Sequence, residues 1–484
     1  MATTVSGAGR LARHHLIGLA FWQAWQMVAF CSDAVIADAH LVGFSLKTVV
    51  IACTTLGYLV VMAASGLPRA RLKTPADLAG AAFSMAGGSF VMMLAPFISD
   101  PGLEAAALAF SLAALSIGNA ALLIMWGELW GTLATGRVGR HLYLSYACAF
   151  VLFFGVIALP RPFGGLAACV FPLVSAGILR SCESEPKRTQ RPASPAMKSL
   201  PLPQAVLFTV LLSVVWGISQ NIVPHVAAGD ASGDFMPATM MVAGAAIGAF
   251  ALSLVVSAPP SEAVALYRPV IPAMAAGLMA LVALPPSFAF VGNGLIVMGI
   301  YCLDMFLMLA STDLAFRCRR PTAVVFGGAV FASRVGTLAG SVAGAAALPS
   351  VAQAASFPAV AALCLGVLAC AGTIVFTQAD LQKCYEAAPV PAHGATATIA
   401  QRCTAAARSA GLTAREAQVL GLLVRGRTVH DVCDELVIAP GTAKHHVGNI
   451  YRKLGVGDRR SLYDAVEAVE VEVEGIGAED SPTA

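Results

Sequence analysis

Residues 411–462 read GLTAREAQVLGLLVRGRTVHDVCDELVIAPGTAKHHVGNIYRKLGVGDRRSL, and this stretch decides the fold of the C-terminal part of the chain. Thr413 and Glu416 have the T-x-x-E spacing of a capping box, which predicts that a helix begins there. Gly426 is expected to end that helix. Its apolar stripe consists of Val419, Leu420, Leu422 and Leu423. A second short helix is predicted at about Val429–Leu436.

A tight turn at 437–439 leads into a third predicted helix. Pro440 fits its first turn, where the missing N–H costs nothing, and Gly455 is expected to end it. Its inward face is predicted to contain Val447, Ile450 and Leu454. Its solvent face is polar and mostly basic, and contains Lys444, His445, Asn449, Arg452 and Lys453. A fourth helix is predicted from about Arg459.

Charge agrees with this reading of the helices. Over 402–462 about ten basic residues stand against about five acidic ones, which leaves about +5 concentrated toward the third helix. Two short helices, a tight turn and a third helix with a basic face are what a helix-turn-helix needs to enter the major groove. The positive charge is what binding to DNA phosphates requires.

The same stretch resembles the LuxR-type DNA-binding domain. The residues that carry the resemblance are Leu412, Thr413, Arg415, Glu416, Val419, Leu420, Gly426, Gly441, Thr442, Lys444, His446, Asn449, Ile450, Tyr451, Lys453, Leu454, Gly455 and Val456. The resemblance implies that the third helix enters the major groove of double-stranded DNA and that the domain binds as a homodimer. The DNA-binding residues are expected to be Thr442, Lys444, His445, Asn449, Arg452 and Lys453.

The resemblance gives these residues different roles. Lys444 and His445 are implied to face base edges, whereas Thr442, Asn449 and Lys453 lie near the sugar-phosphate backbone or brace the fold. Two positions depart from the family pattern. Ala443 replaces the usual valine, and Gly448 stands one helical turn after Lys444, where a larger polar residue often lies. Sequence discrimination is then modest, or rests on Lys444, His445 and DNA shape.

The composition of the whole chain points to a membrane protein. Of its 484 residues, 58% are hydrophobic and 12% are charged, whereas soluble proteins carry roughly 25% charged residues. The twelve cysteines show neither a disulfide framework nor metal-ligand spacing. Adjacent residues on a helix do not converge on one ion, so His445 and His446 predict no metal site. We also expect no cofactor and no enzymatic activity, because no catalytic motif is visible.

About twelve apolar segments are long enough to suggest membrane spans. They lie near 16–36, 49–64, 78–98, 105–127, 142–159, 164–179, 203–222, 237–256, 270–284, 291–310, 324–348 and 358–377. With the N-terminus inside, about sixteen basic residues fall in inside loops and only Lys47 and Arg161 fall outside. This bias predicts a multi-pass protein of the cytoplasmic membrane with both termini in the cytoplasm.

The arrangement of the spans resembles the major facilitator superfamily. Six spans precede a long polar loop at about 180–200 and six follow it, over roughly 10–378. The family's loop signature after the second span is absent, since 66–77 reads GLPRARLKTPAD. The predicted fold is therefore an all-α, polytopic bundle followed by a small LuxR-type domain. Together they resemble membrane-bound LuxR-type regulators of some Gram-positive gut and soil bacteria.

Ionisable residues within membrane spans are costly and usually functional. Asp33, Asp304 and Arg334 are therefore candidate ligand-binding residues, and Gln23 and Gln26 share a face of the first span with Asp33. The alternatives are that Asp33 lies at a wet helix end and that Asp304 and Arg334 form a structural pair. Two other patterns predict architecture: interface anchors at four tryptophans and close helix packing at three glycines. They are Trp22, Trp25, Trp126, Trp130, Gly336, Gly340 and Gly344.

The sequence thus predicts four regions with distinct roles. They are a membrane sensor domain at 1–378, a cytoplasmic connector at 379–408, the DNA-binding domain at 409–470 and an acidic tail at 471–484. We predict a membrane-anchored one-component transcription regulator controlled by an unknown small-molecule ligand, with DNA, a second copy and the lipid bilayer as partners. Two alternatives stay open. One is a transporter fused to a regulatory domain, and the other is a helix-turn-helix that binds protein instead of DNA.

Overall fold

The computed structural model describes most of the chain and divides it into two compact units. The described residues are 17–37, 39–41, 43–65, 74–133, 135–182, 201–227, 235–257, 262–318, 320–354, 357–381, 399–424, 429–436, 438–456 and 462. Unit 1 covers Met1–Ala388 and unit 2 covers Pro389–Ala484. Several predictions lie outside the described residues: the loop 66–73, most of the central loop, the helix end at Gly426, the start of a fourth helix at Arg459 and the acidic tail.

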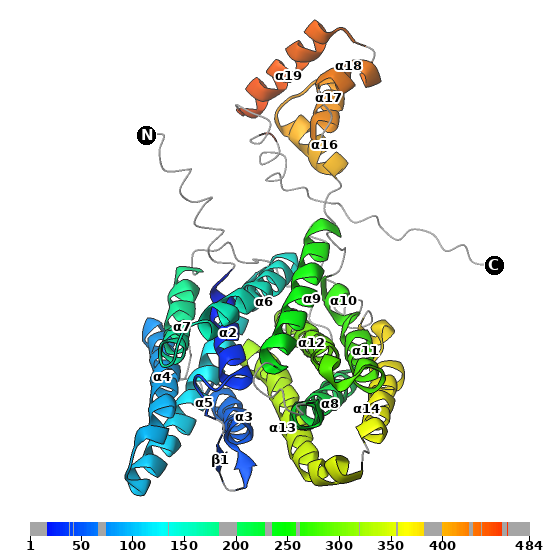
Figure 1. Cartoon of the computed structure of the whole chain (residues 1–484). Helices are drawn as coiled ribbons and strands as arrows, with labels where there is room; N and C mark the ends of the chain where they lie inside the picture. The colour runs from blue at the N-terminus through cyan, green and yellow to red at the C-terminus, as the bar shows by residue number, and fades with distance from the viewer. Residues whose placement is uncertain are drawn as a thin grey trace, which may run out of the picture. The chain divides into compact units, whose positions relative to one another are not determined.

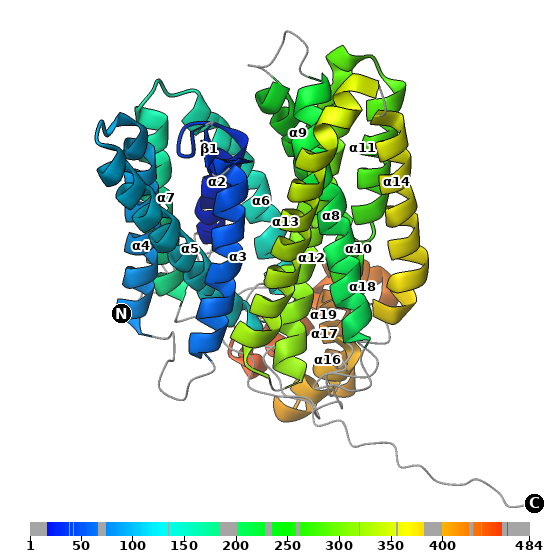
Figure 2. The same ribbon diagram turned by 90° about the horizontal axis from the view of Figure 1, so that it is seen from below.

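Unit 1 is a bundle of long helices in two groups. The first group comprises α2 (Gly18–Cys31), α3 (Leu46–Ser65), α4 (Pro75–Leu94), α5 (Pro101–Thr132), α6 (Thr135–Ile157) and α7 (Phe163–Ser181). The second comprises α8 (Leu202–Ala227), α9 (Phe235–Ser257), α10 (Glu262–Tyr267), α11 (Val270–Ala283), α12 (Ala289–Arg317), α13 (Thr322–Ala354) and α14 (Phe357–Cys370). The two groups lie side by side in both views (Figures 1 and 2), as predicted from six spans on each side of a central loop.

Eleven helical segments among the described residues are long and apolar enough to cross a membrane. Short 3-10 turns extend α4 through Ala95–Phe97 and precede α12 at Pro286–Phe288, and a π turn at Ala371–Val375 follows α14. The remaining predicted span corresponds to α2, whose 14 described residues extend about 21 Å at 1.5 Å per residue. A hydrocarbon core is about 30 Å thick, so α2 by itself is short for a full crossing.

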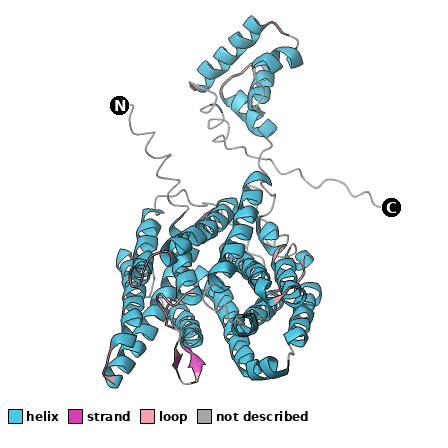
Figure 3. Cartoon of the chain, viewed as in Figure 1, coloured by secondary structure: helices cyan, strands magenta, loops and turns pink. Residues whose placement is uncertain are grey.

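A small β-hairpin follows α2 and is the β-structure of the described chain (Figure 3). Strand β1 (His40–Leu41) pairs antiparallel with β2 (Phe44–Ser45), and Leu41 lies opposite Phe44. Gly43 in the turn has a φ of 80°, a conformation that glycine adopts without steric cost. The all-α prediction therefore holds for every long element of the described chain. The sequence pattern did not predict this short hairpin.

The four tryptophans of the first group are buried in the protein, so the prediction that they are interface anchors is wrong. Trp22, Trp25, Trp126 and Trp130 are each no more than 1% exposed. The indole nitrogen of Trp22 donates to Asn119 Oδ1 at 2.8 Å, that of Trp25 to Ser89 Oγ at 2.9 Å, and that of Trp126 to Ser175 Oγ at 3.0 Å. A polar partner on a neighbouring helix thus replaces the water that an interfacial indole would use.

Helices α8 and α13 approach each other at backbone distance. A Cβ at Gly340 would lie closer than 3.0 Å to the Val214 carbonyl group, and one at Gly217 would meet the Thr337 carbonyl oxygen equally closely. Gly336 faces Val210 in the same way. Small residues allow this approach between membrane helices, where packing replaces the hydrophobic drive. The predicted close packing at Gly336, Gly340 and Gly344 is therefore found against α8.

We expect Gly340→Ala to destabilise unit 1, because its methyl group would collide with the backbone of α8 and force the helices apart. Overpacking of this kind costs roughly 1–3 kcal/mol. Gly328→Ala is the matched control, because Gly328 lies on the same helix and an added Cβ meets nothing within 4 Å. Thermal unfolding of the purified protein in detergent measures both. Equal unfolding temperatures for the two variants would contradict the close contact.

The described part of unit 2 includes four short helices around a core of their own. They are α16 (Ile399–Ser409), α17 (Ala414–Val424), α18 (Val429–Leu436) and α19 (Pro440–Leu454). The buried residues of this core are Cys403, Ala406, Val419, Leu420, Leu423, Val424, Val432, Cys433, Ala443, Ile450 and Leu462. Helix α16 lies inside the stretch predicted as a connector, yet it contributes two of these side chains, Cys403 and Ala406.

The helix boundaries in unit 2 follow the local signals in the sequence. Thr413 and Glu416 form the capping box in both directions: Thr413 N donates to Glu416 Oε2 at 2.8 Å, and Glu416 N donates to Thr413 Oγ1 at 3.3 Å. Pro440 occupies the first turn of α19. Gly455 has a φ of 66° and caps the C-terminal end of α19 in the left-handed conformation. The predicted helix-turn-helix core is confirmed.

Candidate functional site

Helix α19 has one face in the core of unit 2 and one face in solvent. Ala443 and Ile450 are fully buried, and Val447 and Leu454 are partly buried against the same cluster. Thr442, Lys444, His445, Arg452 and Lys453 are exposed, whereas Asn449 is half-buried. At 3.6 residues per turn, Lys444, Gly448 and Arg452 form one ridge along the solvent face. The residues predicted to bind DNA are therefore gathered on or beside this ridge.

Gly448 leaves a gap in the middle of the ridge. A Cβ added there would meet nothing within 4 Å, so the gap is open space and packing does not require glycine at this position. Arg452 Nη2 donates to Asn449 Oδ1 at 2.8 Å, so the amide oxygen of Asn449 already accepts a hydrogen bond within α19. Lys444 and His445 carry the polar groups on the N-terminal half of the face, and a recognition helix uses that half to contact bases.

The side chain of Lys453 is partly exposed, but its ammonium group is bonded to other residues of unit 2. Its ammonium donates to Glu416 Oε2 at 2.7 Å and to the Gly411 carbonyl oxygen at 3.1 Å. The side chain of Glu416 is 5% exposed and that of Lys453 is 29% exposed. This ion pair joins the C-terminal end of α19 to the start of α17, so it fixes the orientation of the recognition helix. Of the two roles implied for Lys453, bracing the fold is the one that these contacts support.

The pKa of Glu416 is lowered from 4.5 to about 2 by the hydrogen bond from Lys453, with the Thr413 backbone N–H as the next cause. A carboxyl whose pKa is lowered by folding stabilises the fold above its unfolded pKa. That stabilisation is lost as pH falls from about 4.5 toward 2. Charge-assisted hydrogen bonds of this kind contribute about 1.5–3 kcal/mol.

We expect the fragment 389–484, which spans unit 2, to lose stability on acidification below about pH 4.5, because protonation of Glu416 breaks its bond to Lys453. Urea unfolding followed by circular dichroism at neutral and acidic pH measures this. Glu416→Gln should lower stability at neutral pH and flatten the acid dependence. Glu435→Gln is a matched control at an exposed carboxylate. An unchanged acid slope in Glu416→Gln would refute this account.

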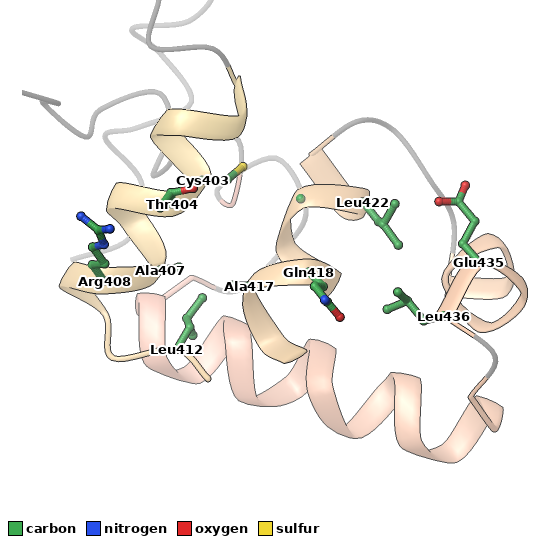
Figure 4. Close-up of a pocket in the computed structure, with 11 residues that line it drawn as sticks. Cys403, Thr404, Ala407, Arg408, Leu412, Ala417, Gln418, Leu422, Glu435 and Leu436 are labelled. Carbon is green, nitrogen blue, oxygen red and sulfur yellow. The ribbon is translucent and has the colours of Figure 1, made fainter. Parts of the chain in front are cut away.

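A groove of about 540 Å³ on unit 2 is lined by none of the residues of α19 (Figure 4). Helix α16 contributes Cys403 and Arg408, α17 contributes Gln418 and Leu422, and α18 contributes Leu436. Every residue that lines it comes from α16, α17, α18 or the loop between α16 and α17. The groove and the predicted DNA-binding face therefore belong to different helices, and the groove is not part of the predicted site.

A larger cavity of about 650 Å³ lies between the two helix groups of unit 1. The first group lines it with α2, the hairpin and α3, and the second group lines it with α8, α9, α12 and α13. Its walls extend from the middle of α12 and α13, at Asp304 and Arg334, to the ends of helices beside the hairpin, at Lys47, His225 and Phe235. The position between two helix groups is that of substrate sites in transporters.

All three charged residues singled out in the membrane domain line this cavity. Asp33 pairs with Lys47 at 3.1 Å, and both side chains are partly exposed, in agreement with a wet helix end. Asp304 and Arg334 interact electrostatically, but the two described side chains form no direct ion pair. They belong to neighbouring helices, α12 and α13, and their polar groups face the same space.

The cavity also contains amides and aromatic rings. Gln23 and Gln26 of α2 line it, as their shared face with Asp33 suggested, and they stand opposite Gln220 of α8 and Tyr301 of α12. Sequence reasoning missed Gln220, Tyr301 and Trp216. For Gln220 a signal was available in the sequence, because Gln220, like Gln26, is a polar residue within an apolar span.

Comparison with known families decides the nature of unit 2. The model of the bacterial regulatory proteins of the luxR family (GerE) matches residues 410–466. This chain carries a LuxR-type helix-turn-helix domain at its C-terminus. In the LuxR-type domain of this chain, the matched stretch includes α17, α18 and α19 in full. The family is one of DNA-binding regulators, which makes DNA a partner of this domain.

Solved transporter structures are similar to most of this chain. A bacterial homologue of the iron transporter ferroportin, crystallised in an outward-facing state, is 15% identical over 75% of this chain and 96% of that chain, with a TM-score of 0.50. The human organic anion transporter MFSD10 (TETRAN) is 15% identical over 67% of this chain and 83% of that chain, with a TM-score of 0.48. A point variant of the E. coli fucose:proton symporter FucP is 13% identical over 73% of this chain and 96% of that chain, also with a TM-score of 0.48.

The chain is therefore a multi-pass membrane protein in which a LuxR-type domain follows a membrane domain with a major-facilitator-like fold. Because the first of these transporters is 15% identical to this chain, the similarity concerns the fold and does not extend to substrate or activity. Neither the regulator family nor the transporter fold is enzymatic. The substrates of those transporters are properties of those proteins. The chemistry of the cavity in this chain depends on the residues that line it.

Proposed function

We propose that this protein is a membrane-anchored one-component transcription regulator. Its LuxR-type domain binds double-stranded DNA as a homodimer, and a small ligand in the cavity of the membrane domain controls that binding. The observation that carries the proposal is the covalent fusion of the LuxR-type domain to the transporter-like bundle. A regulator built this way needs no separate messenger, because sensing and DNA binding occur in one chain.

The DNA-binding half of the proposal rests on the solvent face of α19. Lys444, His445 and Arg452 are exposed on it. The positive charges of Lys444 and Arg452 suit DNA phosphates, and all three side chains can form hydrogen bonds with base edges in a major groove. Thr442 and Asn449 are proposed to contact the sugar-phosphate backbone. Lys453 is proposed to act mainly through Glu416, by fixing the direction of α19.

The orientation of the chain is part of the proposal. The excess of basic residues in the loops predicted to be inside favours both termini in the cytoplasm, where the LuxR-type domain can reach DNA. The hairpin and Lys47 then lie on the outer side, and the lining of the cavity extends toward that side. We propose that ligand binding rocks the two helix groups against each other and changes dimerisation or reach of the LuxR-type domain through the connector.

We expect crosslinking and immunoprecipitation of the full-length protein from its host, followed by sequencing of the bound DNA, to give discrete peaks. In the double variant Lys444→Ala/His445→Ala the peaks should disappear, because each lost base contact removes about 1–3 kcal/mol of discrimination. Arg408→Ala is the matched control, because it removes an exposed positive charge from α16 and leaves α19 intact.

Discrete peaks that depend on Lys444 and His445 would support the regulator and place the C-terminus in the cytoplasm. The absence of peaks under all growth conditions would refute DNA binding from the membrane. A protein recovered in the same immunoprecipitation, without enriched DNA, would instead favour the interaction-module alternative.

The transporter alternative is supported by one specific observation, the charged residues Asp304 and Arg334 in a cavity between transporter-like helix groups. If the protein transports, proteoliposomes that contain it should exchange a labelled substrate. Asp304→Asn should abolish that exchange while Asp100→Asn, at an exposed helix cap, leaves it intact. Ligand binding without exchange in the same vesicles would refute transport and favour a sensor.

A further inference from the structure

The cavity of the membrane domain carries one acid and one base that do not neutralise each other by contact. Asp304 and Arg334 both line it, and their charges interact electrostatically, yet the described side chains form no ion pair. A purely structural pair inside a membrane is expected to be in direct contact, because only close geometry offsets the loss of water around both charges. Here each group keeps free hydrogen-bonding capacity toward the cavity.

Two amides that line the same cavity each have one polar atom without a hydrogen-bond partner. Gln26 is 7% exposed, and its Nε2 donates to Asn119 Oδ1 at 3.4 Å, while its Oε1 has no hydrogen-bond partner. Across the cavity, the Nε2 of Gln220 is buried without a partner. Buried polar groups are nearly always hydrogen-bonded, yet two residues of this lining each retain one buried polar atom without a partner.

Part of the remaining lining is apolar. Phe30, Trp216, Ile300, Phe235 and Met236 line the cavity beside the polar groups. A volume of about 650 Å³ lies within the usual range for small-molecule sites, which combine a few polar groups with apolar walls. The occupant therefore needs a compact charged end and an apolar body.

We propose that this cavity binds a small zwitterion with an apolar body, with its ammonium group at Asp304 and its carboxylate at Arg334. This inference rests on the proposed function of the cavity as the sensory site and names its ligand class. A ligand with one charge would pair with one of these residues and leave the other unpaired. A zwitterion pairs with both, and the amide side chains of Gln26 and Gln220 lie in the same lining.

The test is a matched charge series on the purified full-length protein in detergent. The compounds are L-phenylalanine, phenethylamine and hydrocinnamate, and L-leucine, isoamylamine and isocaproate, which share two apolar bodies and differ in charge. The half-saturating concentration is read from the rise in unfolding temperature. We expect at least one of the two amino acids to bind about tenfold or more tightly than both its amine and its acid.

Variants assign the two charges. Asp304→Asn should weaken binding of the amino acid about tenfold or more, toward the affinity of the acid analogue. Arg334→Gln should weaken it toward the affinity of the amine. Asp100→Asn and Arg140→Gln are matched controls at exposed positions, and they should leave the affinity unchanged. Size-exclusion profiles show whether each variant is folded, and the ranking of the series on the unaltered protein needs no variant.

The outcomes distinguish a failure of the zwitterion proposal from a failure of the proposed regulatory function. Tight binding of an amine alone that is lost in Asp304→Asn would overturn the zwitterion and keep the cavity as a sensory site. No stabilisation by any of the six compounds at millimolar concentration would also overturn the zwitterion. Neither result alters the DNA peaks, whose absence would instead refute the regulator.

Discussion

The close approach of α8 and α13 is the contact on which the membrane domain depends. Gly217, Gly336 and Gly340 let the two backbones meet where a single methyl group would collide with a carbonyl. Both helices turn polar residues toward the central cavity: Gln220 and Asn221 from α8, and Arg334 and Thr337 from α13. The glycines therefore have a second role besides allowing close helix packing. They fix the positions from which the cavity presents its polar groups.

A bilayer offers no water to a polar group, so each one must find a partner in the protein or face a cavity. The first helix group satisfies this constraint with pairs such as Trp22 and Asn119. The second uses Ser213 and Ser333, whose hydroxyl groups lie 3.0 Å apart. Gln26 Oε1 and Gln220 Nε2 have no hydrogen-bond partner, as is also true of one atom each in Tyr58, Ser116 and Asn293. Of these five residues, Gln26 and Gln220 are the two that line the large space between the groups.

The sequence predicted unit 2 well because each helix boundary there has a local cause. The Thr413–Glu416 box, Pro440 and Gly455 act within a few residues of themselves, so their effects can be deduced without a fold. The membrane spans were predictable from hydropathy for a similar reason. Hydropathy does not say which side of a span faces protein, and this is why the tryptophans were wrongly assigned to the lipid interface. All four are core residues, and Trp22, Trp25 and Trp126 have polar partners on other helices.

The cavity of the membrane domain was predictable from the sequence only in part. A charge in an apolar span is visible in the sequence, so Asp304 and Arg334 could be identified as candidates. Their common cavity could not, because it depends on how α12 and α13 rotate against the first helix group. Trp216 and Tyr301 were missed for that reason, since nothing in their neighbours in the chain distinguishes a lining residue from a core residue. The domain boundaries and the residues that contact DNA and ligand remain predictions.

The charges that line the cavity cancel, since Asp33 and Asp304 balance Lys47 and Arg334. An electric field across the membrane acts on net charge, and moving one elementary charge across it changes the energy by about 2.3 kcal/mol per 100 mV. A net-neutral ligand that enters a net-neutral cavity moves almost no charge through that field. Occupancy of such a cavity would then follow the concentration of the ligand outside and would be insulated from the voltage of the cell, whether the cell is well energised or starved.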